Sequence, residues 1–155
     1  MFRLKVALAL LFVAACASVP VRPDPSTALT SFVSAMINAD ADALAAIFAE
    51  DATVFMPFDS APRRIEGREE IRKAFAPLFE QVRKSASAPP YMKLEPRDVM
   101  TQRIGEDVAI LTFHLGDAAA TAPTMFSRRT LVVRFENGRW VVEHLHASNL
   151  RLTPR

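Results

Sequence analysis

The chain lacks several features that would reveal its class at once. Its 155 residues hold a single cysteine, Cys16, which cannot form a disulfide within the chain. There is no internal repeat and no long low-complexity tract, so neither a repeat architecture nor a compositionally biased chain is indicated. Half of the residues are apolar. The length suits one domain, and we therefore expect one packed core.

A long apolar run is missing as well. VALALLFVAA, near the N-terminus, is too short to span a bilayer, and the basic residues Arg3 and Lys5 precede it. This pattern predicts an export signal over residues 1–15.

The end of this run and the residue after it read V-A-A-C, which resembles a bacterial lipobox with valine where leucine is commonest. We expect cleavage before Cys16, lipidation of that cysteine and anchoring to a membrane of the bacterial cell envelope. The alternative is ordinary cleavage, which leaves a soluble periplasmic or secreted protein.

Basic charge is also scarce once the signal is removed. The full chain has 19 basic and 17 acidic residues, and residues 1–15 contain two of the basic ones and no acidic one. Equal numbers of the two signs remain. We therefore expect no nucleic-acid partner. We also expect no cofactor, and membrane contact through the lipid anchor only.

The sequence divides into a tether, one domain and a tail. Residues 16–25 include most of SVPVRPDPS, which has three prolines and little to bury, so a flexible tether is expected there. The domain is expected over residues 26–150, and residues 151–155 form a C-terminal tail.

Apolar residues at helical spacing predict three helices. Ser26 is expected to cap the first, and Asp40 or Asp42 the second, a short helix carrying Phe48. The third covers REEIRKAFAPLFEQVRK, whose apolar stripe is clear, with a kink or a break at Pro77.

The second half of the chain has the texture of β-structure. Strands are expected over residues 52–57, 91–104, 108–116, 125–135 and 139–150. Asn137-Gly138 is a strong signal for a two-residue hairpin turn between the last two strands. Helices followed by an antiparallel meander predict an α+β domain, with the helices on one face of a curved, mainly antiparallel sheet.

The hairpin turn implies a register. With strict alternation, one face carries the opposed pairs Phe135–Trp140, Val133–Val142, Leu131–His144 and Arg129–His146, followed by Ser148. This face begins apolar and becomes polar toward one end, as the wall of a ligand pocket does.

That face supplies the predicted ligand-binding residues, which are Arg129, His144, His146, Trp140 and Ser148. Arg129 would hold a carboxylate or phosphate with two hydrogen bonds. The alternative is that the histidines satisfy backbone groups near the end of the sheet while Arg129 reaches water.

Three motifs, AIFAEDATVFMP, IEGREEIRKAF and GRWVVEHLHAS, resemble in their order the SnoaL-like branch of the nuclear transport factor 2-like superfamily. The resemblance covers about residues 26–150. The last motif is similar to the closing strand of the calcium/calmodulin-dependent kinase association domain. The resemblance implies a cone-shaped α+β roll, a pocket between helices and sheet, and a homodimer or larger oligomer formed through the outer face of the sheet.

The resemblance does not imply one activity. Steroid isomerases of the superfamily carry a general-base aspartate where this chain has Met56, and a tyrosine on the first helix, whereas the only tyrosine here is Tyr91. That chemistry is therefore disfavoured. Dehydratases of the superfamily use a histidine pair with an aspartate, which makes His144, His146 and Asp51 the candidate catalytic residues.

Four functions remain open. The first is binding, without turnover, of a small anionic or carbonyl-bearing molecule. The second is acid–base catalysis of the dehydratase, isomerase or cyclase type by His144 or His146. The third is metal binding with His114 as a third ligand, but no acidic partner is evident and we expect no metal. The fourth is an assembly module whose subunit contact is formed by Arg128, Thr130, Arg134 and Glu143.

Lipidation can be tested directly in a bacterial host. We expect the protein to incorporate radioactive palmitate and Cys16→Ser to incorporate none, because the thiol is the acceptor. An unlabelled wild-type protein, or label that survives Cys16→Ser, would contradict the lipid anchor.

Overall fold

The computed structural model describes residues 22–57, 62, 64–117 and 125–151. The predicted signal, Cys16 and residues 152–155 of the predicted tail lie outside these ranges. Within the described part of the chain, no helix is long and apolar enough to cross a membrane.

Three helices form as the apolar spacing predicts: α1 (Ser26–Ile37), α2 (Ala41–Ala46) and α3 (Arg68–Arg83). The Asp40 side chain accepts a hydrogen bond from the Ala43 backbone N–H and caps α2, as predicted. The prediction for Ser26 was wrong. It is the first helical residue, and its own backbone N–H bonds to the Asp24 carboxylate.

One helix boundary differs from the prediction, and of the kink or break expected at Pro77 the break does not occur. Phe48 begins a strand rather than ending α2, because its backbone lies beside β6 and its side chain is fully buried in the core. At Pro77, α3 runs on without a break. The proline removes one backbone hydrogen bond, but Phe75 and Phe79 on either side of it are buried and hold the helix against the sheet.

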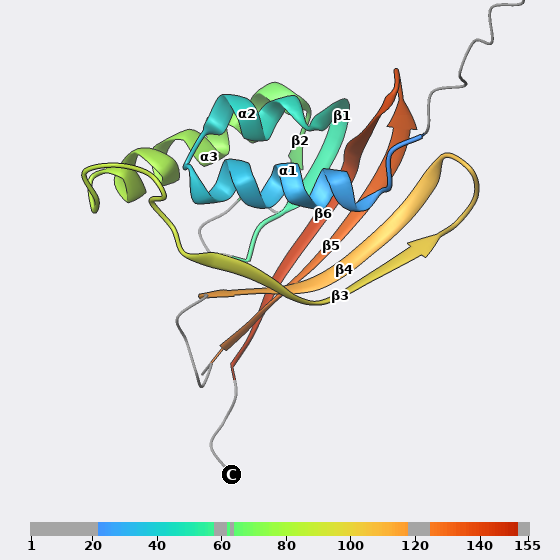
Figure 1. Ribbon diagram of the computed structural model, residues 1–155. Helices are drawn as coiled ribbons and strands as arrows, with labels where there is room; N and C mark the ends of the chain where they lie inside the picture. Colours follow the sequence, from blue (N-terminus) through green and yellow to red (C-terminus); the bar gives the residue numbers. More distant parts are fainter. Residues whose placement is uncertain (1–21, 58–61, 63, 118–124, 152–155) are drawn as a thin grey trace, which may run out of the picture.

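The strands form one six-stranded sheet, in the order β2-β1-β6-β5-β4-β3. Their bounds are β1 (Phe48–Phe55), β2 (Ile65–Glu66), β3 (Leu94–Arg103), β4 (Val108–Asp117), β5 (Met125–Glu136) and β6 (Arg139–Arg151). β1 runs parallel to β6, and all other neighbours are antiparallel. The helices cover one face of this curved sheet, which we call the inner face (Figure 1). The predicted α+β class and the cone-shaped roll are confirmed.

The core lies between the helices and the inner face. Alternate residues of the central strands are fully buried there, including Leu111, Leu131 and Val133, and they face helical residues such as Phe32 and Phe79. Residues one position along from these strand residues point to the opposite, outer face.

The predicted register of the last hairpin is correct near the turn and wrong beyond it. Glu136 faces Arg139, Phe135 faces Trp140 and Val133 faces Val142, but the next pair is Val132 with His144. Glu143 is therefore an extra residue in β6, a β-bulge, and every side chain after it changes face. Leu145 and Ala147 turn inward, while His144, His146 and Ser148 turn outward.

Candidate functional site

The inner face carries a small cavity between α1, α3 and the last two strands. Its volume is about 40 Å³, and its lining consists of Phe32, Met36, Met56, Pro57, Phe75, Leu78, Arg129, Leu145 and Ala147. Eight of these nine side chains are apolar. Arg129 is the only charged group among the described residues of the lining.

Arg129 reaches the cavity because β5 alternates regularly up to that residue. It lies opposite Ala147, one step beyond the fully buried Leu131 on the same face. One guanidinium nitrogen donates to the Arg128 carbonyl oxygen at 2.9 Å. A guanidinium has five N–H donors, and no ion pair among the described residues involves Arg129.

Partial burial among apolar side chains makes the charged form of Arg129 less favourable than it is in water. Burial lowers the pKa of the Arg129 guanidinium to about 10, because the charged form loses hydration. The group nevertheless stays cationic near neutral pH. The cavity therefore presents an unpaired cation within an apolar lining.

The cavity volume limits what can sit beside Arg129. A water molecule occupies roughly 30 Å³ in the liquid, and pockets that enclose drug-sized ligands have volumes of roughly 300–1,000 Å³. The space among the described residues thus suits a carboxylate-sized group and is too small for a fused-ring molecule. The apolar lining further favours a ligand whose body carries few hydrogen-bonding groups.

The two histidines lie on the outer face, away from Arg129. Their predicted grouping into one three-residue site was wrong, because the bulge at Glu143 turns them to the other side of the sheet. His144 Nδ1 and Thr53 Oγ1 are 2.7 Å apart and share a hydrogen bond. The Phe55 ring contacts both imidazoles, with centroids 5.5 Å from His144 and 5.9 Å from His146.

The surroundings of His144 favour the neutral form of its imidazole. His144 is half-buried, and its burial lowers its pKa, with a further lowering from the neighbouring charge of His146. His146 itself is exposed. No carboxylate bonds to either ring among the described residues, so the pair lacks the acidic partner that the dehydratase comparison requires.

The other predicted site residues are dispersed. Trp140 is buried and donates from Nε1 to the Pro23 carbonyl oxygen at 2.8 Å, at the far end of the strand from Arg129. Ser148 lies on the outer face opposite Arg128. Asp51 is exposed in a polar hollow that it shares with Arg134.

The metal hypothesis gains no support from these positions. His114 lies on β4, two strands away from the histidine pair of β6 on the outer face, and its ring bonds to Asp98 at 2.9 Å. No group of three or more potential ligands gathers within the described ranges.

Several site residues escaped prediction from the sequence. Met36 and Met56 enter the cavity wall, and Thr53 and Phe55 flank the histidines. The signal that could have placed Met36 on the inner side is its helical spacing of four residues from Phe32. No local signal could pair Thr53 with His144, because the parallel contact between β1 and β6 joins residues far apart in the chain.

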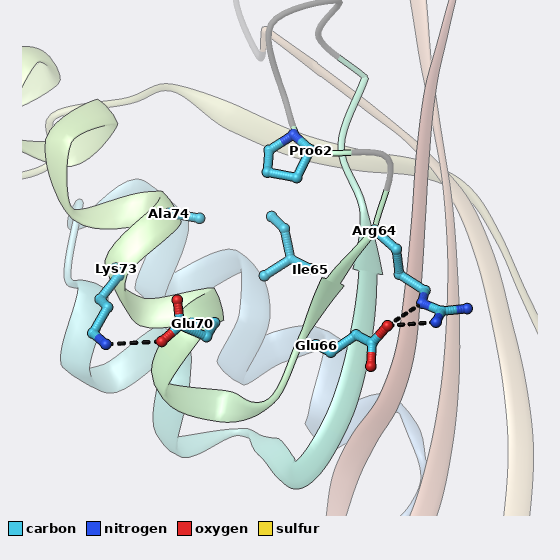
Figure 2. A pocket seen from close by; sticks show the side chains of 7 residues that line it. All are labelled: Pro62, Arg64, Ile65, Glu66, Glu70, Lys73 and Ala74. Carbon is cyan, nitrogen blue, oxygen red and sulfur yellow. Dashed lines mark hydrogen bonds and ion pairs between the residues drawn. The ribbon is translucent and has the colours of Figure 1, made fainter.

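A larger, open hollow beside β2 and α3 has little capacity for a charged ligand (Figure 2). Its charges pair with one another, Arg64 with Glu66 and Lys73 with Glu70. The remaining lining residues are Pro62, Ile65 and Ala74. Among the described lining residues, no cation or anion remains unpaired to select a ligand.

Comparisons with known proteins agree with this architecture. The family model of the SnoaL-like domain matches residues 26–151, and the chain belongs to that family. None of the curated protein sequences matches it. The nuclear transport factor 2-like relationship expected from the three motifs is confirmed by the family match and by solved structures.

Three solved structures illustrate the range of these relatives. A candidate calcium/calmodulin-dependent protein kinase type II association domain from Thiobacillus denitrificans is 26% identical, with a TM-score of 0.62, covering 86% of this chain and all of that one. A candidate dehydratase of the NTF2-like family from Streptomyces avermitilis is 20% identical, with a TM-score of 0.62 and coverage of 82% and 94%. A candidate ketosteroid isomerase from Parabacteroides distasonis is 22% identical, with a TM-score of 0.59 and coverage of 81% and 87%. The last two show the fold alone.

The histidine pair yields a prediction about titration. We expect the pKa of His144 to lie below the ordinary value of 6.5, because burial disfavours the imidazolium. The contribution of this site to stability is then fully present above pH 6.5 and is lost as the pH falls toward the lowered pKa. NMR titration of the His144 ring resonances measures it. In His146→Asn the pKa should rise only part of the way, since burial remains. A wild-type value at or above 6.5 would contradict the assignment.

Proposed function

We propose that this protein is an exported, lipid-anchored SnoaL-like domain that binds a small anion with an apolar body, such as an aliphatic carboxylate, in its inner cavity. One observation carries the proposal: Arg129 is a half-buried cation without an anionic partner among the described residues, and it lines an apolar cavity.

The energetics of Arg129 support an anionic ligand. A buried charge without a partner destabilises the folded state by several kcal/mol in unfavourable cases, so it is rarely kept for stability alone. A carboxylate would accept two parallel hydrogen bonds from the guanidinium and neutralise it. The same anion would place its apolar part against Phe32, Phe75 and Leu78.

Binding is favoured over acid–base turnover in this cavity. Catalysis requires a group that exchanges a proton near neutral pH. Among the described lining residues, Arg129 is the only one that titrates, and its pKa of about 10 is too high for that role. Met56 occupies the cavity wall at the position where the resemblance implies a base. An enzyme that used His144 and His146 would have to work on the outer face.

The anion site is tested with propionate, a short-chain carboxylate, as the probe and with two neighbouring substitutions. We expect propionate to raise the melting temperature of wild type and of Arg128→Met, and to leave that of Arg129→Met unchanged. Arg128 is the matched control because it is the adjacent residue, exposed on the outer face. Without ligand, Arg129→Met should be more stable than wild type by up to about 1 kcal/mol, because a half-buried charge with no partner among the described residues has been replaced by an apolar side chain.

Propan-1-ol serves as the uncharged control and should shift none of the three proteins. The proposal fails if propionate stabilises Arg129→Met as much as wild type, or does not stabilise wild type at all. A loss of stability in ligand-free Arg129→Met would assign Arg129 a structural role instead.

A second proposal concerns the outer face, which we infer pairs with another copy of the chain. Phe55, Met100 and Leu150 expose 37%, 59% and 44% of their surface there, and the half-buried Val132 lies among the central strands. Exposed apolar side chains that share one sheet face are typical of a subunit contact. The Thiobacillus denitrificans relative is described as a candidate association domain, which supports this proposal.

Light scattering tests the pairing. We expect the domain to be a dimer or larger at micromolar concentration and Val132→Lys to be a monomer, because the new ammonium group would be buried beside Arg134. Ser31→Lys adds the same charge at an exposed position of α1 and should leave the assembly intact. A monomeric wild type, or an unchanged assembly in Val132→Lys, would refute the outer face as the contact.

A further inference from the structure

The first described residues are fixed to one end of the sheet. The Arg22 guanidinium lies over the Phe135 ring, 3.9 Å from its centroid, and 5.0 Å from the Trp140 ring. The same guanidinium pairs with Asp107 at 2.5 Å. Arg22 therefore joins the start of the domain to the turn between β3 and β4 and to the hairpin of β5 and β6.

Two further contacts hold the residues that follow Arg22. The Pro23 carbonyl accepts the Trp140 indole N–H at 2.8 Å, and the Asp24 carboxylate lies 3.4 Å from the Arg103 guanidinium. We call Arg22–Asp24 with these partners the N-terminal clamp. Cation–π contacts and exposed ion pairs are individually weak, so several together are needed to define one position.

The clamp determines where the preceding segment joins the domain. Only five residues lie between Cys16 and Arg22, and the six steps from one Cα to the next span at most about 20 Å when the chain is fully extended. β5 alone, with 12 residues, is about 40 Å long. A lipid at Cys16 could therefore keep the clamped end near a bilayer but not the opposite end.

We propose that the N-terminal clamp faces the membrane and holds the β3–β4 turn, residues 104–107, against the lipid surface, while the Arg129 cavity opens away from it. The inference rests on the proposed lipid anchor at Cys16. Arg129 is six residues from Phe135 along β5, which places the cavity about 20 Å farther from the clamped end. Figure 1 shows the chain entering at that end of the sheet.

The charges at the clamped end largely cancel, so a lipid anchor rather than electrostatic attraction would hold this end at the membrane. Ile104, at the tip of the β3–β4 turn, exposes 57% of its surface, and its neighbour Arg103 belongs to the clamp. The cations Arg22, Arg103 and Arg139 are offset by the anions Asp24, Glu106, Asp107 and Glu136. Attraction to anionic headgroups is therefore weak, and the position of the turn should not depend on salt.

Fluorescence quenching in vesicles tests this orientation. The full-length protein is processed in a bacterial host, so that Cys16 carries its lipid, and is reconstituted into phosphatidylcholine vesicles containing a headgroup spin label. A fluorophore is attached to Ile104→Cys, or to Lys84→Cys as the control at the far end of α3 (Figure 1). We expect several-fold stronger quenching at position 104 than at position 84, unchanged by salt.

Two variants separate the clamp from the anchor. Arg22→Ala loses the ion pair and both ring contacts, and inserting about twelve Gly/Ser residues after Pro20 extends the reach to about 60 Å without touching the clamp. Both should reduce the quenching at position 104 to the level of position 84.

Vesicle flotation distinguishes failure of the lipid anchor from failure of the proposed orientation. Protein that does not float overturns the anchor and the inference with it. Protein that floats with equal quenching at both positions, or whose difference survives the insertion, overturns the orientation alone.

Discussion

The bulge at Glu143 is the constraint on which the distribution of functional side chains depends. Glu143 is the extra residue between Val142 and His144, and its carboxylate accepts a hydrogen bond from Arg134 Nε at 2.6 Å. Arg134 also pairs with Glu136, so one guanidinium holds the bulge and the start of the hairpin together. Because strand side chains alternate with a period of two, one inserted residue exchanges the faces of all that follow.

The exchange gives the two faces of β6 different chemistry. On the inner side, Leu145 and Ala147 complete an apolar wall opposite Arg129. On the outer side, His144 and His146 meet Thr53 and Phe55 on the parallel strand β1. Had alternation continued, the imidazoles would have faced Arg129 as polar neighbours in one site. The bulge instead keeps the cation among apolar groups and leaves the histidines half-buried or exposed on a surface rich in apolar and threonine side chains.

Features of the fold that depend on neighbouring residues could be predicted from the sequence, whereas features that depend on contacts between distant residues could not. Helical spacing identified all three helices, and Asn137-Gly138 identified the hairpin, because both residues adopt the positive φ angles, 51° and 81°, that such a turn requires. These signals are local. The bulge has no comparable signature, since Glu143 is an ordinary strand residue until its partner Arg134 is known. The start of β1 at Phe48 and the continuous helix through Pro77 depend on distant packing as well. The fold could therefore be predicted, whereas the composition of the site could not.

Arg129 occupies a position where stability alone would favour an apolar residue. Local alternation, hydrophobic patterning and turn chemistry agree elsewhere in the sheet, and a sequence selected for stability alone would place an apolar residue after Leu131 on the inner face. A guanidinium there loses hydration, as its lowered pKa records, and gains one backbone hydrogen bond in return. Local conflict of this kind is characteristic of functional sites, where a bound partner completes what the folded chain leaves open. A ligand present at about a hundred times its dissociation constant stabilises its protein by about 2.7 kcal/mol, which is comparable with the loss that such a charge imposes. The cation has no anionic partner among the described residues, and this supports our proposal that an anion from outside the chain binds it.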